Sequence, residues 1–340
     1  MKGKRLGMRI KATAYNLSSV FILVSIMLLF SIIIKVVNGQ TFMTPSNLSV
    51  IINQAAFLAV LGVAQMLTIL VGGINLSIGS VMAFTTMLCG PLLLESNNYS
   101  PFLAPVIMII VGTLVGIFNG FLITKVKLPA FIATFGTMYI VRGVTWIIAG
   151  NTVYFRINPA IRTLTQGQVL NVFNFSINMP VIVCAIVLVI FTLLLRRTVF
   201  GRNVYFTGSN PTAARFSGIA VDKLIITMYA LAGTMSGFCG VLFAARMNAC
   251  EANMYTDSHF TAVSVALLSG VSMAGGFGNI WACAIGALII AGIQNGMNLL
   301  RVPSELQTLV LGVLIILSVF FNERLIRKRM DLVSQLEGDA

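Results

Sequence analysis

The sequence predicts an all-α protein that crosses a membrane many times. The chain has 340 residues, of which 58% are hydrophobic and 9% are charged, whereas about half and about a quarter are usual in soluble domains. Its mean hydropathy is +0.96, and many of its apolar runs approach the roughly 20 residues that a spanning helix needs. These observations exclude a soluble globular enzyme and a disordered chain.

Apolar runs separated by charged or Gly-, Pro- and Asn-rich breaks define the expected spans. We expect ten, at about 17–37, 48–71, 76–94, 102–123, 129–148, 180–195, 224–245, 260–273, 279–300 and 306–321. About eight to eleven spans fit the same pattern, because several runs are short. Gly72-Gly73 and Gly275-Gly276 interrupt the apolar pattern without a charge, so each is a tight turn or a broken helix enclosed by protein.

The basic residues, which give a net charge of +13, predict the orientation of a single transmembrane domain over 1–340. Sixteen of the 22 Lys and Arg residues fall in 1–16, 125–127, 196–223 and 322–340. This positive-inside bias places an N-terminal segment, a coupling loop over 196–223, a C-terminal tail and both termini in the cytoplasm. We expect contact with membrane lipid and no nucleic-acid partner, because these charges lie at span ends. The first run lacks a convincing cleavage site and is interpreted as a retained span.

A short motif occurs twice. Gly116-Ile117-Phe118-Asn119-Gly120 recurs as Gly292-Ile293-Gln294-Asn295-Gly296, five spans later and therefore in the opposite orientation. Such an echo predicts two inverted five-helix halves, although a match this short also arises by chance.

Groups that carry chemistry are scarce within the expected spans. All nine acidic residues fall in predicted loops or the tail, and the single histidine, His259, lies near an outer span end. This pattern disfavours proton or sodium coupling and a membrane-embedded enzyme. The five cysteines lack metal-ligand spacing, and the chain has no G-x-x-x-x-G-K-[ST] motif. We therefore expect no catalytic residue, metal or cofactor in this chain, and ATP, if used, in a partner subunit.

The 196–223 loop contains a predicted short helix. Asn210 suits an N-cap and Pro211 the first helical position, Ala213 and Ala214 favour helix, and Gly218 suits the C-terminal stop. This helix either rests on lipid headgroups or docks a partner.

Neutral polar residues recur within the spans and predict a path for an uncharged polyhydroxylated solute. The candidates are Asn53, Gln65, Asn75, Ser77, Asn119, Thr134, Thr137, Asn295 and Asn298, and Gln54, Ser80 and Gln294 are further neutral polar groups of the same pattern. Each is also compatible with a role in helix packing alone. Arg142 lies well inside a span and either binds an anionic solute or bonds to helix-end carbonyls.

Several segments together resemble the monosaccharide permeases of bacterial ATP-binding-cassette importers, of the ribose, xylose and galactose type. That group shares a superfamily with branched-chain amino-acid permeases. The resemblance covers most of the chain and rests on Gly73–Ser80, Pro129–Thr134 with Arg142-Gly143, Gly201–Ile219, Ala274–Gly278 and Asn295–Leu299. Many relatives carry Asp where this chain has Asn75.

The resemblance implies a permease of the bacterial inner membrane that pairs with an identical or paralogous permease. A periplasmic or extracellular binding protein would deliver a neutral monosaccharide, and a tandem-domain ATPase would dock on the coupling loop. It adds Phe131 to the path, and for coupling it implies Gly201, Gly208, Asn210, Pro211, Ala213, Ala214, Arg215, Ser217 and Gly218. The alternative is a self-sufficient sugar facilitator or secondary transporter.

Overall fold

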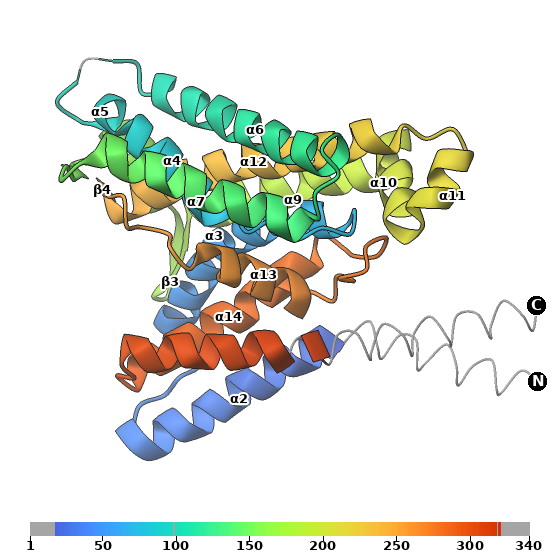
Figure 1. Ribbon diagram of the computed structural model, residues 1–340. Helices are drawn as coiled ribbons and strands as arrows, with labels where there is room; N and C mark the ends of the chain where they lie inside the picture. The colour runs from blue at the N-terminus through green and yellow to red at the C-terminus, as the bar shows by residue number, and fades with distance from the viewer. Residues whose placement is uncertain (1–17, 98, 318, 321–340) are drawn as a thin grey trace, which may run out of the picture.

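The computed structural model describes residues 18–97, 99–317 and 319–320, and most of them form helices (Figure 1). The expected N-terminal segment 1–16 and tail 322–340 lie outside the described residues. The helices are α2 (Ser18–Asn38), α3 (Pro45–Ile69), α4 (Ile78–Leu88), α5 (Gly90–Leu93), α6 (Leu103–Thr124), α7 (Ala130–Ala149), α8 (Pro159–Gln166), α9 (Met179–Arg197), α10 (Val199–Ser209), α11 (Pro211–Phe216), α12 (Val221–Met247), α13 (Ser258–Leu268) and α14 (Ala282–Leu299). A further apolar helix, Ser304–Leu317, follows α14.

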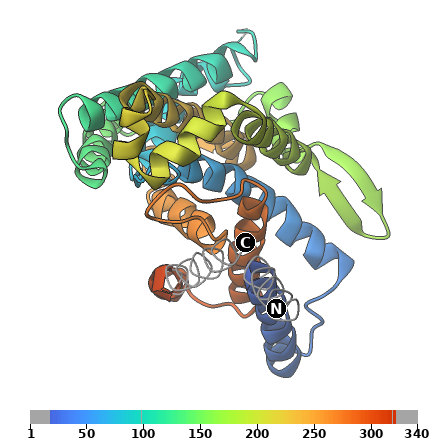
Figure 2. The same cartoon turned by 90° about the vertical axis from the view of Figure 1, so that its right-hand side faces the viewer.

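In the part of the chain that the structure describes, sheet is confined to two short antiparallel pairs. Strand β1 (Tyr154–Phe155) pairs with β4 (Ala249–Cys250), and β2 (Gln168–Val172) pairs with β3 (Phe175–Asn178). Figure 2 shows the β2–β3 hairpin projecting from the helical body. Hydrogen bonds tie it to the start of α3, where the hydroxyls of Ser49 and Ser176 lie 2.8 Å apart.

The helices confirm the all-α, multi-spanning fold class. Within the described residues, seven helices are long and apolar enough to cross a membrane: α2, α3, α6, α7, α9, α12 and α14. Three shorter apolar helices are α4, α13 and Ser304–Leu317. Each of the ten expected spans overlaps one of these ten helices, but ten membrane crossings remain a prediction because three of the helices are short.

Helices α3 and α12 form the centre of the bundle. In their most apolar stretches 78% and 61% of residues are buried, against 11% in α2. Helix α6 crosses α12 at glycines, and a Cβ on Gly112 would overlap the backbone of Gly233 and Gly237. Small residues of this kind allow two helix backbones to approach closely.

Two half-length helices, α4 and α13, each follow an irregular stretch, at 70–77 and 248–257. Helix α4 packs against α12, while α13 packs against α3. The two helices begin next to each other, because a Cβ on Gly79 would lie 3.5 Å from the Ser258 Cβ and 3.6 Å from the His259 nitrogen. The predicted interruption at Gly72-Gly73 is a tight turn that ends α3. Gly72 adopts a φ of +80°, its amide donates to the Ile69 carbonyl at 2.8 Å, and the Gly73 amide donates to the Thr68 carbonyl at 3.0 Å. Gly275-Gly276, with φ values of +87° and +70°, is a tight turn as well.

The bundle has two distinct ends (Figure 1). The α11 end carries α10, α11 and the start of α12, and the hairpin end carries the β strands. At the α11 end, Asp222 accepts hydrogen bonds from Arg215 at 2.8 Å and Lys125 at 3.3 Å. Two of the four basic segments that the charge pattern placed on one side of the membrane, 125–127 and 196–223, therefore meet here.

Candidate substrate path and coupling end

The predicted helix in the 196–223 loop is present as α11. The Asn210 Oδ1 accepts from the Ala213 amide at 2.9 Å, Pro211 occupies the first turn, and Gly218 follows the helix with a φ of +80°. The preceding helix, α10, is capped in the same way by Thr198, whose hydroxyl accepts from the Gly201 amide at 3.1 Å. The loop is thus a two-helix unit with defined caps.

The α11 surface is divided between a packed and an exposed side. Ala214 is 0% exposed, whereas the apolar Phe216 side chain is 89% exposed at the end of the bundle. Arg215, although exposed, is held by Asp222 of α12. A small buried residue and a fixed charge anchor α11, and a large apolar side chain is left available for contact.

A glycine junction connects α10 to both interrupted segments. A Cβ on Gly208 would overlap the Leu70 carbonyl oxygen and the Gly276 nitrogen. A Cβ on Gly275 would lie 2.9 Å from the Gly72 nitrogen and from the Gly208 oxygen, and the Gly276 amide donates to the Leu70 carbonyl at 3.0 Å. Both Gly-Gly joints therefore meet α10 at the α11 end, so a displacement of α10 disturbs both.

A buried polar network supports the irregular stretch 70–77. The Asn75 Oδ1 accepts from the Ser77 amide at 3.0 Å and from its hydroxyl at 2.7 Å, and Asn119 donates to that hydroxyl at 2.9 Å. The Thr134 hydroxyl accepts from the Leu76 amide at 3.2 Å. These bonds satisfy polar groups where the helix is interrupted, as the interior of a membrane protein requires.

Gln65 completes this network. With the carboxamide atoms assigned from their partners, its nitrogen donates to the Asn75 carbonyl at 2.8 Å and its oxygen accepts from the Asn75 amide at 3.1 Å. The structure thus brings together five of the predicted path residues. These are Gln65, Asn75, Ser77, Asn119 and Thr134, each at most 2% exposed.

The other predicted path residues lie elsewhere. Asn53 bonds to the hairpin, accepting from the Asn178 amide at 2.9 Å, and Asn298 accepts from Gln307 at 2.9 Å. Asn295 is 7% exposed on α14. Thr137 lies on α7 and is 2% exposed, whereas Phe131 is exposed on α7 and stacks on Phe135 with ring centroids 5.7 Å apart.

Arg142 donates hydrogen bonds to backbone carbonyls. This is the second of the two roles that the sequence allowed, the first being binding of an anionic solute. Its Nη1 donates to the Ala252 carbonyl at 2.7 Å and to the Met254 carbonyl at 3.1 Å. Trp146, one turn further along α7, donates to the Asn253 side chain at 3.1 Å. Helix α7 thereby fixes the irregular stretch that leads into α13.

The sequence interpretation missed a cavity beside α13. It is lined by Asn253, by residues 255–258 and 260–261, by Gln294 of α14 and by the helix Ser304–Leu317. The charge pattern places Asp257 in a predicted loop, and α13 covers Ser258–Leu268, so it begins two residues before the expected 260–273 run and ends five residues before its end.

The chain is an apolar helical bundle in which side chains hydrogen-bond the irregular stretch 70–77 and the capped helices α10 and α11 lie at one end. These features define a multi-pass membrane protein of the transport class. A family model described as "Branched-chain amino acid transport system / permease component" matches residues 47–319. The chain belongs to this family, because the match covers most of its length. It is a transporter subunit and not an enzyme.

Curated relatives cover similar lengths. The D-allose transport system permease protein of Escherichia coli K12 is 35% identical over 291 residues, which is 85% of this chain and 86% of the relative. The ribose import permease protein of Bacillus subtilis 168 is 32% identical over 86% of this chain and 89% of the relative. The fructose import permease protein of Rhizobium meliloti is 28% identical over 88% and 83%. No solved structure matches the chain.

Proposed function

We propose that this chain forms the membrane path of an ATP-binding-cassette importer for a neutral monosaccharide in the bacterial inner membrane. The observation that carries the sugar class is that relatives over more than four fifths of the chain are named for allose, ribose and fructose. A buried network of amides and hydroxyls around 70–77 is compatible with this class, since such groups exchange hydrogen bonds with hydroxyls without needing a charge. A facilitator or secondary transporter has no comparable support.

The coupling loop 196–223 is the proposed docking site for the ATPase. Its support is the capped unit α10–α11, the exposed Phe216 and the contact of Gly208 with both Gly-Gly joints. Motion of a docked ATPase would be transmitted through α10 to both Gly-Gly joints. The residues proposed for coupling are those that the resemblance implies, from Gly201 to Gly218.

The α11 end is the proposed cytoplasmic end, and the whole chain is one transmembrane domain with both termini in the cytoplasm. The positive-inside rule supports this orientation. A second permease, identical or paralogous, a tandem-domain ATPase and a sugar-binding protein on the outer side complete the proposed assembly.

Co-purification tests this proposal directly. The tagged chain is solubilised gently from its native membrane, and its partners are identified by mass spectrometry after mild crosslinking. We expect a P-loop ATPase and a solute-binding protein. Recovery of the chain alone after crosslinking would favour the facilitator.

A further inference from the structure

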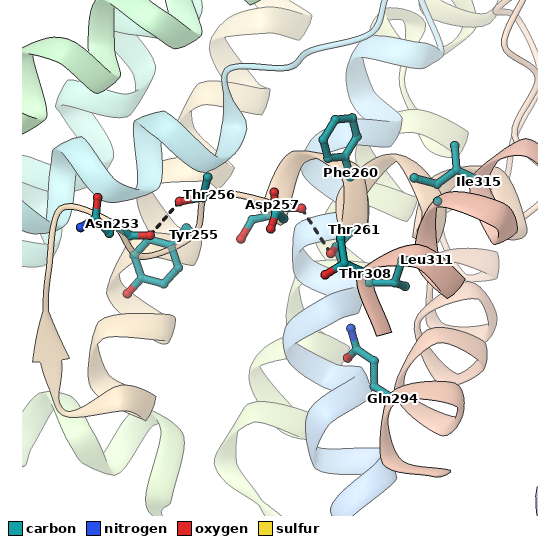
Figure 3. A pocket seen from close by; sticks show the side chains of 12 residues that line it. Asn253, Tyr255, Thr256, Asp257, Phe260, Thr261, Gln294, Thr308, Leu311 and Ile315 are labelled. Atoms are coloured by element: carbon teal, nitrogen blue, oxygen red, sulfur yellow. Dashed lines mark hydrogen bonds between the residues drawn. The ribbon is translucent and has the colours of Figure 1, made fainter. Parts of the chain in front are cut away.

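A cavity of about 700 Å³, with several polar groups in a mostly apolar lining, lies between the segment that starts α13, helix α14 and the helix Ser304–Leu317 (Figure 3). We propose that it is a binding station for a neutral polyhydroxylated solute of monosaccharide size, and that the Asp257 carboxylate accepts hydrogen bonds from the solute hydroxyls. The inference rests on the proposed function and supplies a solute site for it. The volume falls within the roughly 300–1,000 Å³ of small-molecule sites.

Asp257 is an exposed carboxylate among apolar helices. It occupies the N-cap position of α13 but its side chain makes no capping hydrogen bond. Gln294, which lines the same cavity, lies five residues from the end of α14 and thus about 7 Å along that helix. Ionisable residues in a membrane protein almost always face a water-filled cavity or a polar partner and not lipid, and Asp257 borders this cavity.

The cavity offers both donors and acceptors. The Gln294 side-chain oxygen accepts from Gln54 at 2.7 Å, which leaves its amide nitrogen as a donor, and Figure 3 shows that nitrogen pointing toward Thr308. The Thr261 and Thr308 hydroxyls donate to backbone carbonyls, at 3.4 and 3.1 Å, so their oxygens remain acceptors. Sugar hydroxyls, which both donate and accept, match this mixture.

The remaining lining favours a sugar over an inorganic cation. The Phe260 side chain is 50% exposed and supplies an apolar surface for the C–H groups of a sugar ring. Asp257 is the one acidic residue of the lining, and it attracts the nearby Arg142. One carboxylate with a neighbouring guanidinium holds a cation poorly, whereas it accepts hydrogen bonds from neutral hydroxyls strongly.

Cysteine labelling tests whether water and sugar reach the cavity. Thr308→Cys lies in the lining, and Leu309→Cys lies next to it on the same helix but outside the lining. The five native cysteines are buried and give little background. We expect a hydrophilic maleimide to label Thr308→Cys at least about tenfold faster than Leu309→Cys, because thiolates form in water and not in lipid. Slow labelling of both variants would overturn the proposal.

Uptake tests the role of Asp257 in the complete transporter, with D-ribose, D-allose, L-arabinose and D-fructose as probes. We expect Asp257→Asn to lower uptake of the transported sugar about tenfold, the usual loss for a hydrogen bond to a charge. ATP hydrolysis should fall less than twofold, and the matched control Glu251→Gln should behave as wild type.

Undiminished uptake by Asp257→Asn would refute its role. The sugar should also protect Thr308→Cys from labelling, and absence of protection would count against the site even if Asp257→Asn fails to fold. If the wild-type complex takes up none of the four sugars, the proposed function fails, whereas the labelling result still reports on the cavity itself.

Discussion

The hydroxyl of Thr134 connects two elements at a point where a helix is interrupted. It accepts from the Leu76 amide at 3.2 Å, and its single proton lies within hydrogen-bonding distance of the Ala130 carbonyl, at 2.9 Å, and of the Ile74 carbonyl, at 3.1 Å. Asn119 supports the same stretch through Ser77. At the residue scale, several side chains that were predicted to line a path form hydrogen bonds to backbone groups of the irregular stretch 70–77, which have no helical partners.

Removing this hydroxyl should destabilise the protein. Thr134→Val keeps the shape of the side chain but leaves the buried Leu76 amide without a partner, at a cost of about 1–3 kcal/mol. The measurement is the thermal unfolding temperature in detergent. The control is Thr227→Val, whose exposed hydroxyl bonds only to the Lys223 carbonyl of its own helix. Equal unfolding temperatures for the two variants would show that Thr134 does not brace this stretch.

A charge under α11 should uncouple transport. Ala214 is 0% exposed, so Ala214→Asp must either bury a carboxylate, at several kcal/mol, or displace the helix. We expect ATP-driven uptake to be lost while the amount of protein in the membrane is unchanged, as read by quantitative blotting. Gln166→Glu adds the same charge on exposed α8 at the opposite end and should transport normally. Normal uptake by Ala214→Asp would place the coupling elsewhere.

At the element scale, the glycine junction at Gly208 joins α10 to both Gly-Gly joints. The added methyl group of Gly208→Ala would overlap Leu70 and Gly276 backbone atoms, so α10 must shift, at about 1–3 kcal/mol. We expect lower uptake and a lower unfolding temperature. Gly136→Ala, whose Cβ meets nothing within 4 Å, is the control. If the Gly208→Ala protein is as stable and active as that control, the close packing at Gly208 does not couple α10 to the Gly-Gly joints.

The link between α7 and the stretch before α13 can be tested through Cys250. Burial raises the pKa of the Cys250 thiol to about 12, so at pH 8 it is protonated and reacts slowly. Arg142→Met removes the bonds to Ala252 and Met254. The stretch before α13 should then become more exposed, so the pKa of the Cys250 thiol should fall toward its ordinary value. Maleimide should then label Cys250 at least about tenfold faster. Arg142→Lys, which keeps a donor, should label at an intermediate rate, and unchanged labelling of both would refute the link.

Much of this element organisation follows from the sequence. Hydropathy located every apolar helix, and cap residues such as Asn210 predicted α11. Hydropathy did not predict that α4 and α13 are both half-length helices that follow an irregular stretch, because the two stretches have different kinds of sequence. Residues 70–77 are mostly apolar or small, whereas 251–257 carry charges and resemble an ordinary loop. Only the tertiary contacts of Arg142 reveal that this second stretch enters the bundle.

At the scale of the whole molecule, two inverted halves remain a prediction, and some helix contacts occur in the matching pairs that related halves would give. Helix α4 packs on α12 as α13 packs on α3, and α6 packs on α12 as α14 packs on α3. The motif glycines, however, have different neighbours. Gly116 approaches Tyr229 of α12, whereas Gly296 approaches Phe30 of α2. Two copies of a short motif therefore need not make the same contacts, because the neighbours of each glycine depend on the surrounding fold.

The candidate site was only partly predictable for a similar reason. Composition indicated neutral polar groups within spans, and the structure joins five of them in one network. The cavity at Asp257 depends on three segments far apart in the chain, 253–261, Gln294 and Ser304–Leu317. A single sequence contains no signal that brings these segments together.

On the proposed function, this chain moves a sugar only when a separate ATPase drives it. The most direct measurement is uptake of labelled D-ribose, D-allose, L-arabinose and D-fructose into proteoliposomes that contain the chain alone or with its ATPase and binding protein, with ATP or a non-hydrolysable analogue. We predict accumulation of at least one sugar in the complete system with ATP, and none with the chain alone or with the analogue. Sugar entry through the chain alone, independent of ATP, would contradict the account.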